Sequence, residues 1–335
     1  MTSTFSVAYE LICFRSSSDK DFIGALKIYQ HSIPHEQKTN SSEISYWIDN
    51  VKSFSIGKLF FFGLKLNNQI IGYAELAYIK RDRILIIDYI TLEESYKTNS
   101  GFYTFYSLII NYIKEKNIDF DFVTKEVLCR YNETYIHKED VTKYELENFK
   151  VINSLYIQPQ LEPNNAESEK DALLMICMRG SLEGYLKKDA YMNIVAAIYE
   201  YYRMWDVPFY SDKEKYNFSI NTEKNKKRIL ESIKTDKIKL NGYPFKYTSS
   251  ENGIFIPAKR NKSFILALIS VILLIIIILL ILLVLNYLQY EKQSILIIGS
   301  AVILIFILLL IILDDGVVHK LKQVPFISKI YELLK

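Results

Sequence analysis

Residues 84–116 read ILIIDYITLEESYKTNSGFYTFYSLIINYIKEK and contain two elements of different periodicity joined by a polar loop. Residues 84–92 form a short apolar run rich in isoleucine, which predicts a buried strand. Residues 101–116 carry apolar side chains at helical spacing, which predicts a helix with one buried face. These apolar helix residues are Phe102, Phe105, Tyr106, Ile109 and Ile113. A strand, a polar loop and a helix therefore follow one another here.

The chain before this stretch predicts a strand, two helices and a hairpin. Residues 8–14 form a strand-like run, and residues 20–31 follow with apolar side chains at roughly helical spacing. Ser41-Ser42-Glu43 predicts the start of a second helix, because a serine side chain can accept a backbone N–H of the first turn. Residues 59–66 and 69–79 read as two strands joined by an Asn-Asn turn.

The chain after this stretch continues the alternation of strands and helices. Residues 120–128 predict a strand, and residues 139–147 predict a helix. Residues 150–158 and 172–178 then predict a hairpin whose connecting loop is polar. The predicted order from the N-terminus is β-α-α-β-β-β-α-β-α-β-β.

Three short motifs occur in order along residues 8–179. They are Ile87–Leu92 followed by Tyr96-Lys97, then Tyr144–Phe149, in which a tyrosine lies five residues before an aromatic residue, and finally Tyr156–Pro159. Together with the element order, they resemble the GNAT superfamily of acyl-CoA-dependent N-acetyltransferases. In that family they correspond to the fourth strand with its pyrophosphate loop, the end of the fourth helix, and the terminal hairpin of one branch. The resemblance implies an α/β fold with a mixed, mostly antiparallel central sheet flanked by helices.

The reaction implied by the resemblance is attack of an amine on an acyl thioester, with acetyl-CoA as the expected donor. Tyr144 matches the position of the family's usual general acid, which protonates the leaving thiolate. Asp88 is the candidate for receiving the amine proton, directly or through water. The resemblance also assigns residues of the fourth strand and the following loop to acetyl-CoA. These are Ile90, Thr91, Leu92, Lys97, Thr98, Asn99, Ser100, Gly101 and Phe102.

The predicted phosphate loop differs from the family pattern. The usual signature is Gln or Arg, two residues, Gly, one residue, then Gly or Ala, whereas the matching positions here are Lys97, Ser100 and Phe102. Lys97 keeps a positive charge close to a helix start, where an anion is favoured. Phe102 is expected either to point away and leave the helix N-terminus open, or to fill the place of the pyrophosphate.

Composition excludes several other classes of function. The formal net charge of +3 over 335 residues is too small to indicate a nucleic-acid partner. Cys13, Cys129 and Cys177 lack metal-ligand spacing and lie among apolar neighbours, so they are expected to be reduced core residues. His31 and His35 are four residues apart, but the intervening proline breaks the helix that would aim both at one metal. We therefore predict no metal site.

Residues 181–262 predict a connector with a basic segment. Residues 189–206 carry an aromatic face at helical spacing, end before Pro208, and are expected to pack on the preceding domain. A second helix is predicted from Asn221 or Thr222 to Lys234. Its basic side chains are compatible either with contact to anionic headgroups or with a solvated face. Asn241-Gly242 then gives a hairpin signal.

Two apolar runs predict a membrane hairpin. Residues 264–285 and 295–313 are each long enough to span the hydrocarbon layer, and the short segment between them makes the two helices antiparallel. Basic residues precede the first run and follow the second, so both termini are expected on the cytoplasmic side. The N-terminus lacks a signal-peptide pattern, which also favours a cytoplasmic domain. Residues from 324 onward are compatible with a helix on the membrane surface or with a solvated tail.

The sequence therefore predicts four parts: residues 1–180 as the GNAT-like domain, 181–262 as the connector, 263–313 as the hairpin and 314–335 as a cytoplasmic tail. The leading hypothesis is a membrane-anchored N-acyltransferase acting on a small-molecule or protein amine. The alternative is a catalytically inactive binding or regulatory module that signals through the hairpin. A third hypothesis is a membrane effector that forms a homo-oligomer through the hairpin. The expected partners are the lipid bilayer and the amine, with no nucleic acid.

Overall fold

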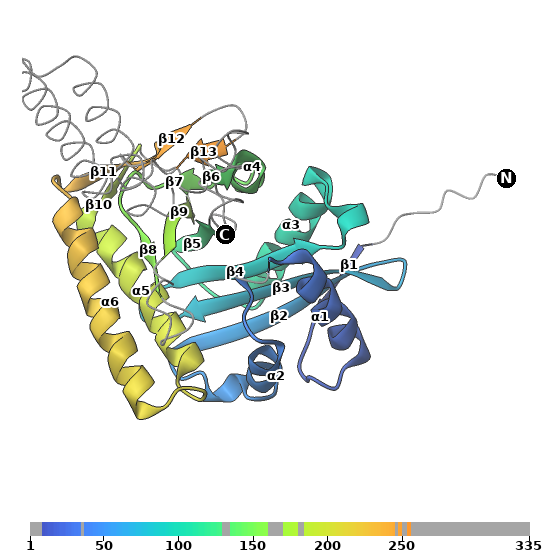
Figure 1. The fold of residues 1–335 in the computed structure, drawn as a ribbon. Helices are drawn as coiled ribbons and strands as arrows, with labels where there is room; N and C mark the ends of the chain where they lie inside the picture. The colour runs from blue at the N-terminus through green and yellow to red at the C-terminus, as the bar shows by residue number, and fades with distance from the viewer. Residues whose placement is uncertain are drawn as a thin grey trace, which may run out of the picture. The chain divides into compact units, whose positions relative to one another are not determined.

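The structure is a computed structural model that describes residues 9–34, 37–128, 135–159, 170–179, 184–244, 247–249 and 253–255. These residues belong to one compact unit, Met1–Pro257 (Figure 1). The helices are α1 (Lys20–Ser32), α2 (Ser41–Asp49), α3 (Asn99–Glu115), α4 (Lys138–Glu145), α5 (Lys188–Asp206) and α6 (Asp212–Ser232). The strands are β1 (Tyr9–Cys13), β2 (Gly57–Leu66), β3 (Gln69–Ile79), β4 (Ile84–Leu92), β5 (Phe122–Leu128), β6 (Tyr135–His137), β7 (Lys150–Val151), β8 (Ile157–Gln158), β9 (Lys170–Met178), β10 (Tyr185–Lys187), β11 (Lys237–Lys239), β12 (Thr248–Ser249) and β13 (Gly253–Phe255).

The main sheet has the strand order β1-β2-β3-β4-β5-β9-β7, and β8 also pairs with β9. Within the described part of this sheet, β4 and β5 form the one parallel pair, and the other pairs are antiparallel. Parallel pairing of consecutive strands needs a crossover, and α3 supplies it. The mixed, mostly antiparallel sheet predicted from the sequence is thus confirmed.

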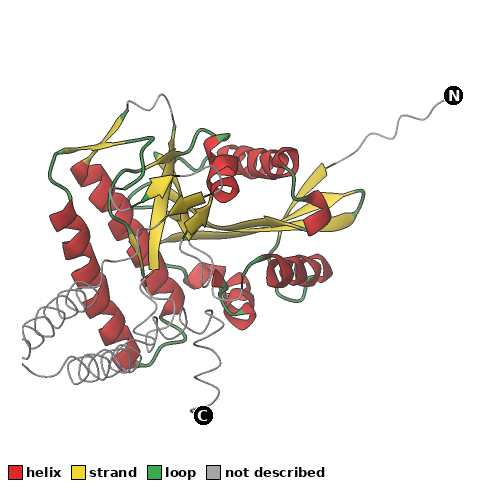
Figure 2. Cartoon of the chain, turned by 45° about the horizontal axis from the view of Figure 1, so that its top comes forward, coloured by secondary structure: helices red, strands yellow, loops and turns green. Residues whose placement is uncertain are grey.

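Helices cover both faces of this sheet (Figure 2). On one face, the hydrophobic cluster contains side chains of α1, α2, α5 and α6, with Trp47, Tyr199 and Ile229 among its buried members. On the other face, the cluster contains side chains of α3 and α4, with Phe105 and Tyr144 among its buried members. We refer to these as the α5 face and the α3 face. A sheet buried on both sides explains why β4 reads as an almost continuous apolar run.

Helix α5 joins the core of the sheet as the sequence predicted. Its aromatic stripe is buried, and the Trp47 indole N–H donates to the Trp205 carbonyl at 3.0 Å, which ties α2 to the end of α5. The predicted start of the next helix at Asn221 or Thr222 is wrong. Helix α6 begins at Asp212, because Ser211 and Glu214 form a capping box about ten residues earlier along the chain.

The predicted hairpin at Asn241-Gly242 is also wrong. Asn241 does adopt a positive φ of 58°, as the turn signal requires. However, β11 pairs with β10, about 50 residues earlier along the chain, while Leu240 forms an isolated bridge with Ile152. The turn therefore redirects the chain and does not fold it back on itself.

The predicted membrane hairpin at residues 263–313 and the tail at 314–335 lie outside the described residues. Within the described ranges, no helix is long and apolar enough to cross a bilayer.

Candidate active site

Strands β4 and β5 separate halfway along their length. Their ladder runs from Ile84 opposite Phe122 to Ile87 opposite Lys125 and stops there. Beyond this point β4 remains paired with β3 as far as Leu92, and β5 remains paired with β9. The facing edges of the two strands therefore carry backbone N–H and C=O groups without a ladder partner on that side. A buried edge of this kind requires other hydrogen-bonding groups.

A β-bulge at Asp88 starts the separation. In the β3–β4 ladder, Glu75 lies opposite Tyr89 and Leu76 lies opposite Ile87, so Asp88 is the additional residue. A bulge bends its strand and leaves the extra residue outside the regular pairing. Asp88 is also the one residue of β4 that is not fully buried. The bulge therefore places an acidic residue in the centre of an otherwise apolar strand.

Lys125 lies at the same point on β5. It is partly exposed between the buried residues Thr124 and Glu126. Its Nζ donates to the main-chain carbonyl of Asp88 and, at 3.4 Å, to that of Ile87. Burial lowers the pKa of Lys125, and the nearby Asp88 carboxylate opposes this shift. A lysine ammonium thus binds two carbonyls of the β4 edge at the closed end of the split.

Three carboxylates lie on neighbouring strands of the α5 face, namely Glu75 on β3, Asp88 on β4 and Glu126 on β5. Two consecutive tyrosines of α5 bind them. The Tyr201 hydroxyl lies 2.8 Å from Asp88 Oδ2 and 3.4 Å from Glu75 Oε1. The Tyr202 hydroxyl donates to Glu126 Oε2 at 2.6 Å. Helix α5 therefore covers the acidic side of the split and supplies hydrogen bonds to each carboxylate.

Burial makes these three carboxyl groups weaker acids than usual. Burial raises the pKa of Glu75 well above its ordinary value, and the charge of Asp88 adds to this effect. Burial also raises the pKa of Asp88, while Lys125 and the Tyr201 hydroxyl oppose the shift. The pKa of Glu126 rises to about 7 by burial, although hydrogen bonds from Tyr156 and Tyr202 favour the charged form. A carboxylate with a raised pKa is a stronger base.

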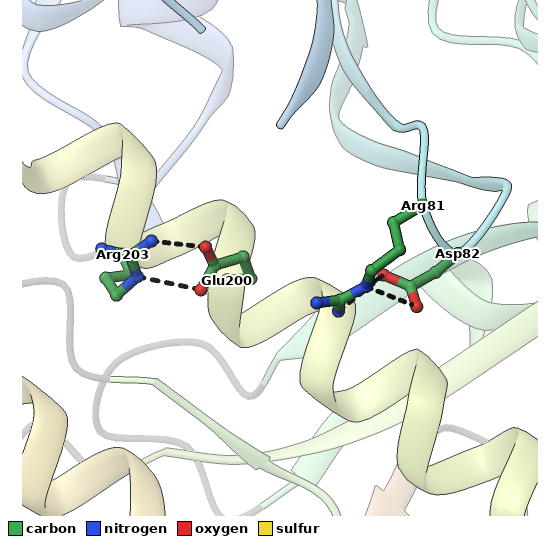
Figure 3. A network of polar contacts seen from close by, with 4 residues as sticks. All are labelled: Arg81, Asp82, Glu200 and Arg203. Atoms are coloured by element: carbon green, nitrogen blue, oxygen red, sulfur yellow. Dashed lines mark hydrogen bonds and ion pairs between the residues drawn. The ribbon is translucent and has the colours of Figure 1, made fainter. Parts of the chain in front are cut away.

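Charged residues also flank α5 where it passes the β3–β4 turn. On α5, Arg203 Nε donates to Glu200 Oε2 at 2.9 Å, and in the turn Arg81 Nη2 lies 2.9 Å from Asp82 Oδ2 (Figure 3). The hydrogen bond from Arg203 lowers the pKa of Glu200, and the charge of Arg81 contributes in the same direction.

The N-terminus of α3 lies beside the end of β4. Thr98 caps the helix, and its Oγ1 accepts the Gly101 N–H at 3.1 Å. A Cβ at Gly101 would lie 2.7 Å from the Tyr96 carbonyl oxygen and 3.1 Å from Leu92, so only glycine fits between the loop and the helix. The N–H groups of Asn99 and Ser100 come before the first intrahelical bond and are available for an anion.

Phe102 points away from this helix start. Its side chain is 7% exposed and packs edge-on against Tyr144, with ring centroids 5.1 Å apart. Of the two orientations considered for Phe102, the structure has the one that leaves the helix N-terminus open. The Nζ of Lys97 lies 2.6 Å from Glu94 Oε2, so this lysine forms an ion pair within the loop before α3.

A hollow of about 260 Å³ opens between the first turns of α3 and the end of α4. Its lining residues are Ser100, Tyr103, Lys143, Leu146 and Glu147. Lys143 brings a positive charge to this hollow, and its Nζ lies 3.1 Å from Asp140 Oδ1. The sequence analysis selected Lys97 as the positive charge near the helix start and did not select Lys143. The hollow is lined by α3 and by residues at the end of α4, which are distant in sequence.

The two predicted catalytic residues lie on opposite faces of the sheet. Tyr144 belongs to the α3 face, where it is 2% exposed and also packs against Phe149. Burial raises its pKa, so its hydroxyl stays protonated at neutral pH. The carboxyl group of Asp88 accepts a hydrogen bond from the Tyr201 hydroxyl on the α5 face.

The predicted residues at the end of β4 line the edge of the split through their main chain. The side chains of Ile90 and Leu92 are buried in the cluster of the α3 face, and Thr91 is also buried. Their contribution to an extended ligand would therefore come from backbone N–H and C=O groups.

Comparison with solved structures finds similarity to N-acetyltransferases. One is an acetyltransferase from Salmonella typhimurium that modifies the N-terminal serine of a 50S ribosomal subunit protein, at 14% identity over 52% of this chain and 97% of that chain, with a TM-score of 0.38. Another is an acetyltransferase of the GNAT family from Streptococcus pneumoniae, at 16% identity over 51% of this chain and 100% of that chain, with a TM-score of 0.36. A third is an N-acetyltransferase from Staphylococcus aureus, at 14% identity over 51% of this chain and 97% of that chain, with a TM-score of 0.35. No family model and no curated protein matches the sequence.

Proposed function

We propose that the chain is a membrane-anchored N-acyltransferase that transfers an acetyl group from acetyl-CoA to an amine. The split between β4 and β5 at the Asp88 bulge is the observation that carries the proposal. It provides an unpaired strand edge for an extended amide-containing arm, with an anion-binding helix N-terminus at one end and a basic carboxylate at the other.

The residues present fit acetyl-CoA as a co-substrate. The backbone N–H groups of Asn99 and Ser100 and the ammonium of Lys143 would bind its phosphates. The open edge of β4 from Asp88 to Leu92 would hydrogen-bond the pantetheine amides, in the manner of an added strand. Phe102 leaves the helix start open, which supports an accessible phosphate site.

Two side chains would handle the protons of the transfer. Asp88 would accept a proton from the attacking amine, directly or through water, and its raised pKa makes it a more effective base. Tyr144 would donate a proton to the leaving thiolate, because it matches the position of the family's general acid and its hydroxyl is protonated at neutral pH.

Membrane attachment is the second part of the proposal. The apolar runs at 264–285 and 295–313 and the basic residues outside them support two spans with both termini in the cytoplasm. The catalytic unit would then act at the cytoplasmic surface. Exposed lysines of α6, among them Lys224 and Lys227, would lie within reach of anionic headgroups.

One observation favours the alternative of a binding or regulatory module without activity. Tyr201 and Tyr202 occupy hydrogen-bonding positions on the carboxylates that an acceptor amine would use. In this alternative the arm of acetyl-CoA or another ligand binds in the split, while α5 keeps the acceptor side closed.

Release of free CoA in the presence of a panel of amines tests the proposal. The wild-type chain should release thiol from acetyl-CoA faster with at least one amine than without, and Asp88→Asn should abolish most of the amine-dependent part. Glu223→Gln, which changes an exposed carboxylate of α6, is the matched control. Acetyl-CoA binding without amine-dependent release for any amine would favour the regulatory module.

A further inference from the structure

Lys125 has a position that the proposed transfer to an external amine does not use. It is the last β5 residue paired with β4, and it is partly exposed while its neighbours in the strand are buried. Other described lysines near carboxylates, such as Lys97 and Lys226, form exposed ion pairs within a helix or loop. The Nζ of Lys125 instead binds main-chain carbonyls of Ile87 and Asp88 inside the sheet.

An acyl group delivered along the split would end beside this nitrogen. The phosphate-binding helix start packs on Leu92, at the open end of the split. An extended arm that begins there and follows the β4 edge runs from Leu92 back toward Asp88. It must stop where pairing resumes, which is at Ile87 opposite Lys125. The terminal thioester would therefore lie next to the Nζ of Lys125.

The surroundings of Lys125 act in both directions on the balance between its charged form and its uncharged, nucleophilic form. Burial lowers its pKa, and the charge of Lys143 acts in the same direction. Three carboxylates oppose this, namely Asp88, Glu126 and Asp140. The same carboxylates offer a nearby base for the proton that the ammonium must lose. Among the three, Asp88 has the largest effect on the pKa of Lys125.

We propose that Lys125 is an internal acyl acceptor, which the chain acetylates itself when acetyl-CoA occupies the split. The inference rests on the proposed function, because that function supplies the thioester. Lys125 gives one proton to Asp88, and its amine attacks the thioester carbonyl carbon. A carbon–nitrogen bond forms, the carbon–sulfur bond breaks, and the thiolate leaves and takes up a proton. The products are N-acetyl-lysine, free CoA and one proton in excess, which passes to solvent.

Acetylation removes the positive charge that Lys125 contributes beside Asp88. Attraction to this charge now lowers the pKa of Asp88. The modified chain would therefore have an Asp88 that is protonated at higher pH and a split that retains one amide N–H donor in place of an ammonium. Self-acetylation would thus change the base of the same site.

The test uses the full-length chain purified in detergent and incubated with acetyl-CoA at about pH 8, followed by intact mass measurement and peptide mapping. The expected result is a gain of one acetyl group at Lys125, at least about tenfold above an exposed lysine such as Lys114, because positioning raises the effective concentration of the thioester. Lys125→Arg keeps the charge and should lose the modification, whereas Lys114→Arg should behave as wild type. Lys125→Met is the second variant, in case arginine does not fit, and thermal unfolding checks that each variant is folded.

Calorimetry with acetyl-CoA on the same sample separates this inference from the proposed function. Binding of acetyl-CoA with acetylation confined to exposed lysines would overturn the internal acceptor and leave the proposed function in place. Failure to bind acetyl-CoA would overturn both. Faster labelling of Lys125 at about pH 8.5 than at about pH 6.5 is also expected, because the amine must be uncharged to attack.

Discussion

Replacement of Glu126 by glutamine should make the folded chain less sensitive to rising pH. Glu126 is 9% exposed and accepts hydrogen bonds from Tyr156 and Tyr202, both at 2.6 Å. Its pKa is raised from 4.5 to about 7 in the folded chain. Between these two values the folded chain binds more protons than the unfolded chain, so its free energy of unfolding falls as pH rises. The contribution of neutral Glu126 to stability is complete below the pKa of the unfolded chain, 4.5, and is lost as pH rises through the pKa of the folded chain, about 7.

The size of the effect follows from the shift. A shift from 4.5 to about 7 corresponds to about 3 kcal/mol at a pH where Glu126 is ionised in both the folded and the unfolded chain. Part of the titration lies below pH 5, so about 2 to 3 kcal/mol should be lost between pH 5 and pH 8 through Glu126 alone. A glutamine keeps the shape and two hydrogen-bonding atoms but cannot ionise, and this part of the pH dependence should disappear in the variant.

Urea unfolding of the 1–257 fragment at pH 5 and pH 8 measures the difference. This fragment holds both hydrophobic clusters in one compact unit, and its two tryptophans, Trp47 and Trp205, lie 5.7 Å apart where α2 meets α5. Their fluorescence therefore reports the packing of α5 directly. The wild type should lose about 2 to 3 kcal/mol more than Glu126→Gln between the two pH values. Glu223→Gln, on the exposed side of α6, should match the wild type. Equal losses in wild type and Glu126→Gln would refute the assignment of a raised pKa to Glu126.

Four further predictions concern the site and the membrane. Tyr144→Phe should lower the rate of acetyl transfer by about tenfold or more and leave acetyl-CoA affinity nearly unchanged, as steady-state kinetics and calorimetry would reveal; an unchanged rate would exclude Tyr144 as the acid. Asp88→Asn should remove the acidic limb of the pH–rate profile, since the raised pKa of Asp88 sets the pH below which the base is protonated; an unaltered limb would point to another base. Lys97→Ala should weaken acetyl-CoA binding less than Lys143→Ala, because Lys143 lines the hollow at the start of α3 and Lys97 does not, and the reverse order would place the phosphates at Lys97. Tags on both termini should be protected from labelling outside the cell, whereas a cysteine placed between residues 286 and 294 should be labelled; external labelling of the C-terminal tag would contradict the topology.

Local sequence signals were sufficient for most of the described fold. Apolar periodicity predicted β4 with its observed bounds and the helix that follows it. The predicted order holds as far as β5, but β6 was not predicted, and the predicted strand 150–158 contains the two short strands β7 and β8. Signals that depend on a partner far away in sequence were less informative. Asn241 adopts the positive φ that the turn signal predicts, but the strand before it, β11, pairs with β10. A local turn signal does not show which distant strand offers an edge for pairing.

The candidate site shows the same division. Asp88 stands out in the sequence because a carboxylate interrupts an apolar strand, and the structure explains it by the bulge. Glu75, Glu126 and Lys125 also interrupt strands, but each could have been an exposed edge residue. Only the sheet order brings them to neighbouring strands. Tyr202 reads as part of an aromatic core stripe and Tyr201 does not belong to that stripe, because helical spacing reveals the buried face and not the target of a hydroxyl group.

Calorimetric titration of acetyl-CoA into the full-length chain tests the central claim most directly. The split, the open start of α3 and the ammonium of Lys143 predict saturable binding of one acetyl-CoA per chain, weakened by about 1 kcal/mol or more in Lys143→Ala through loss of a charge-assisted phosphate contact. Lys114→Ala, an exposed lysine of the same helix α3, should bind as wild type does. A folded wild-type chain that shows no binding of acetyl-CoA at millimolar concentration would contradict an acyl-CoA site between β4 and β5.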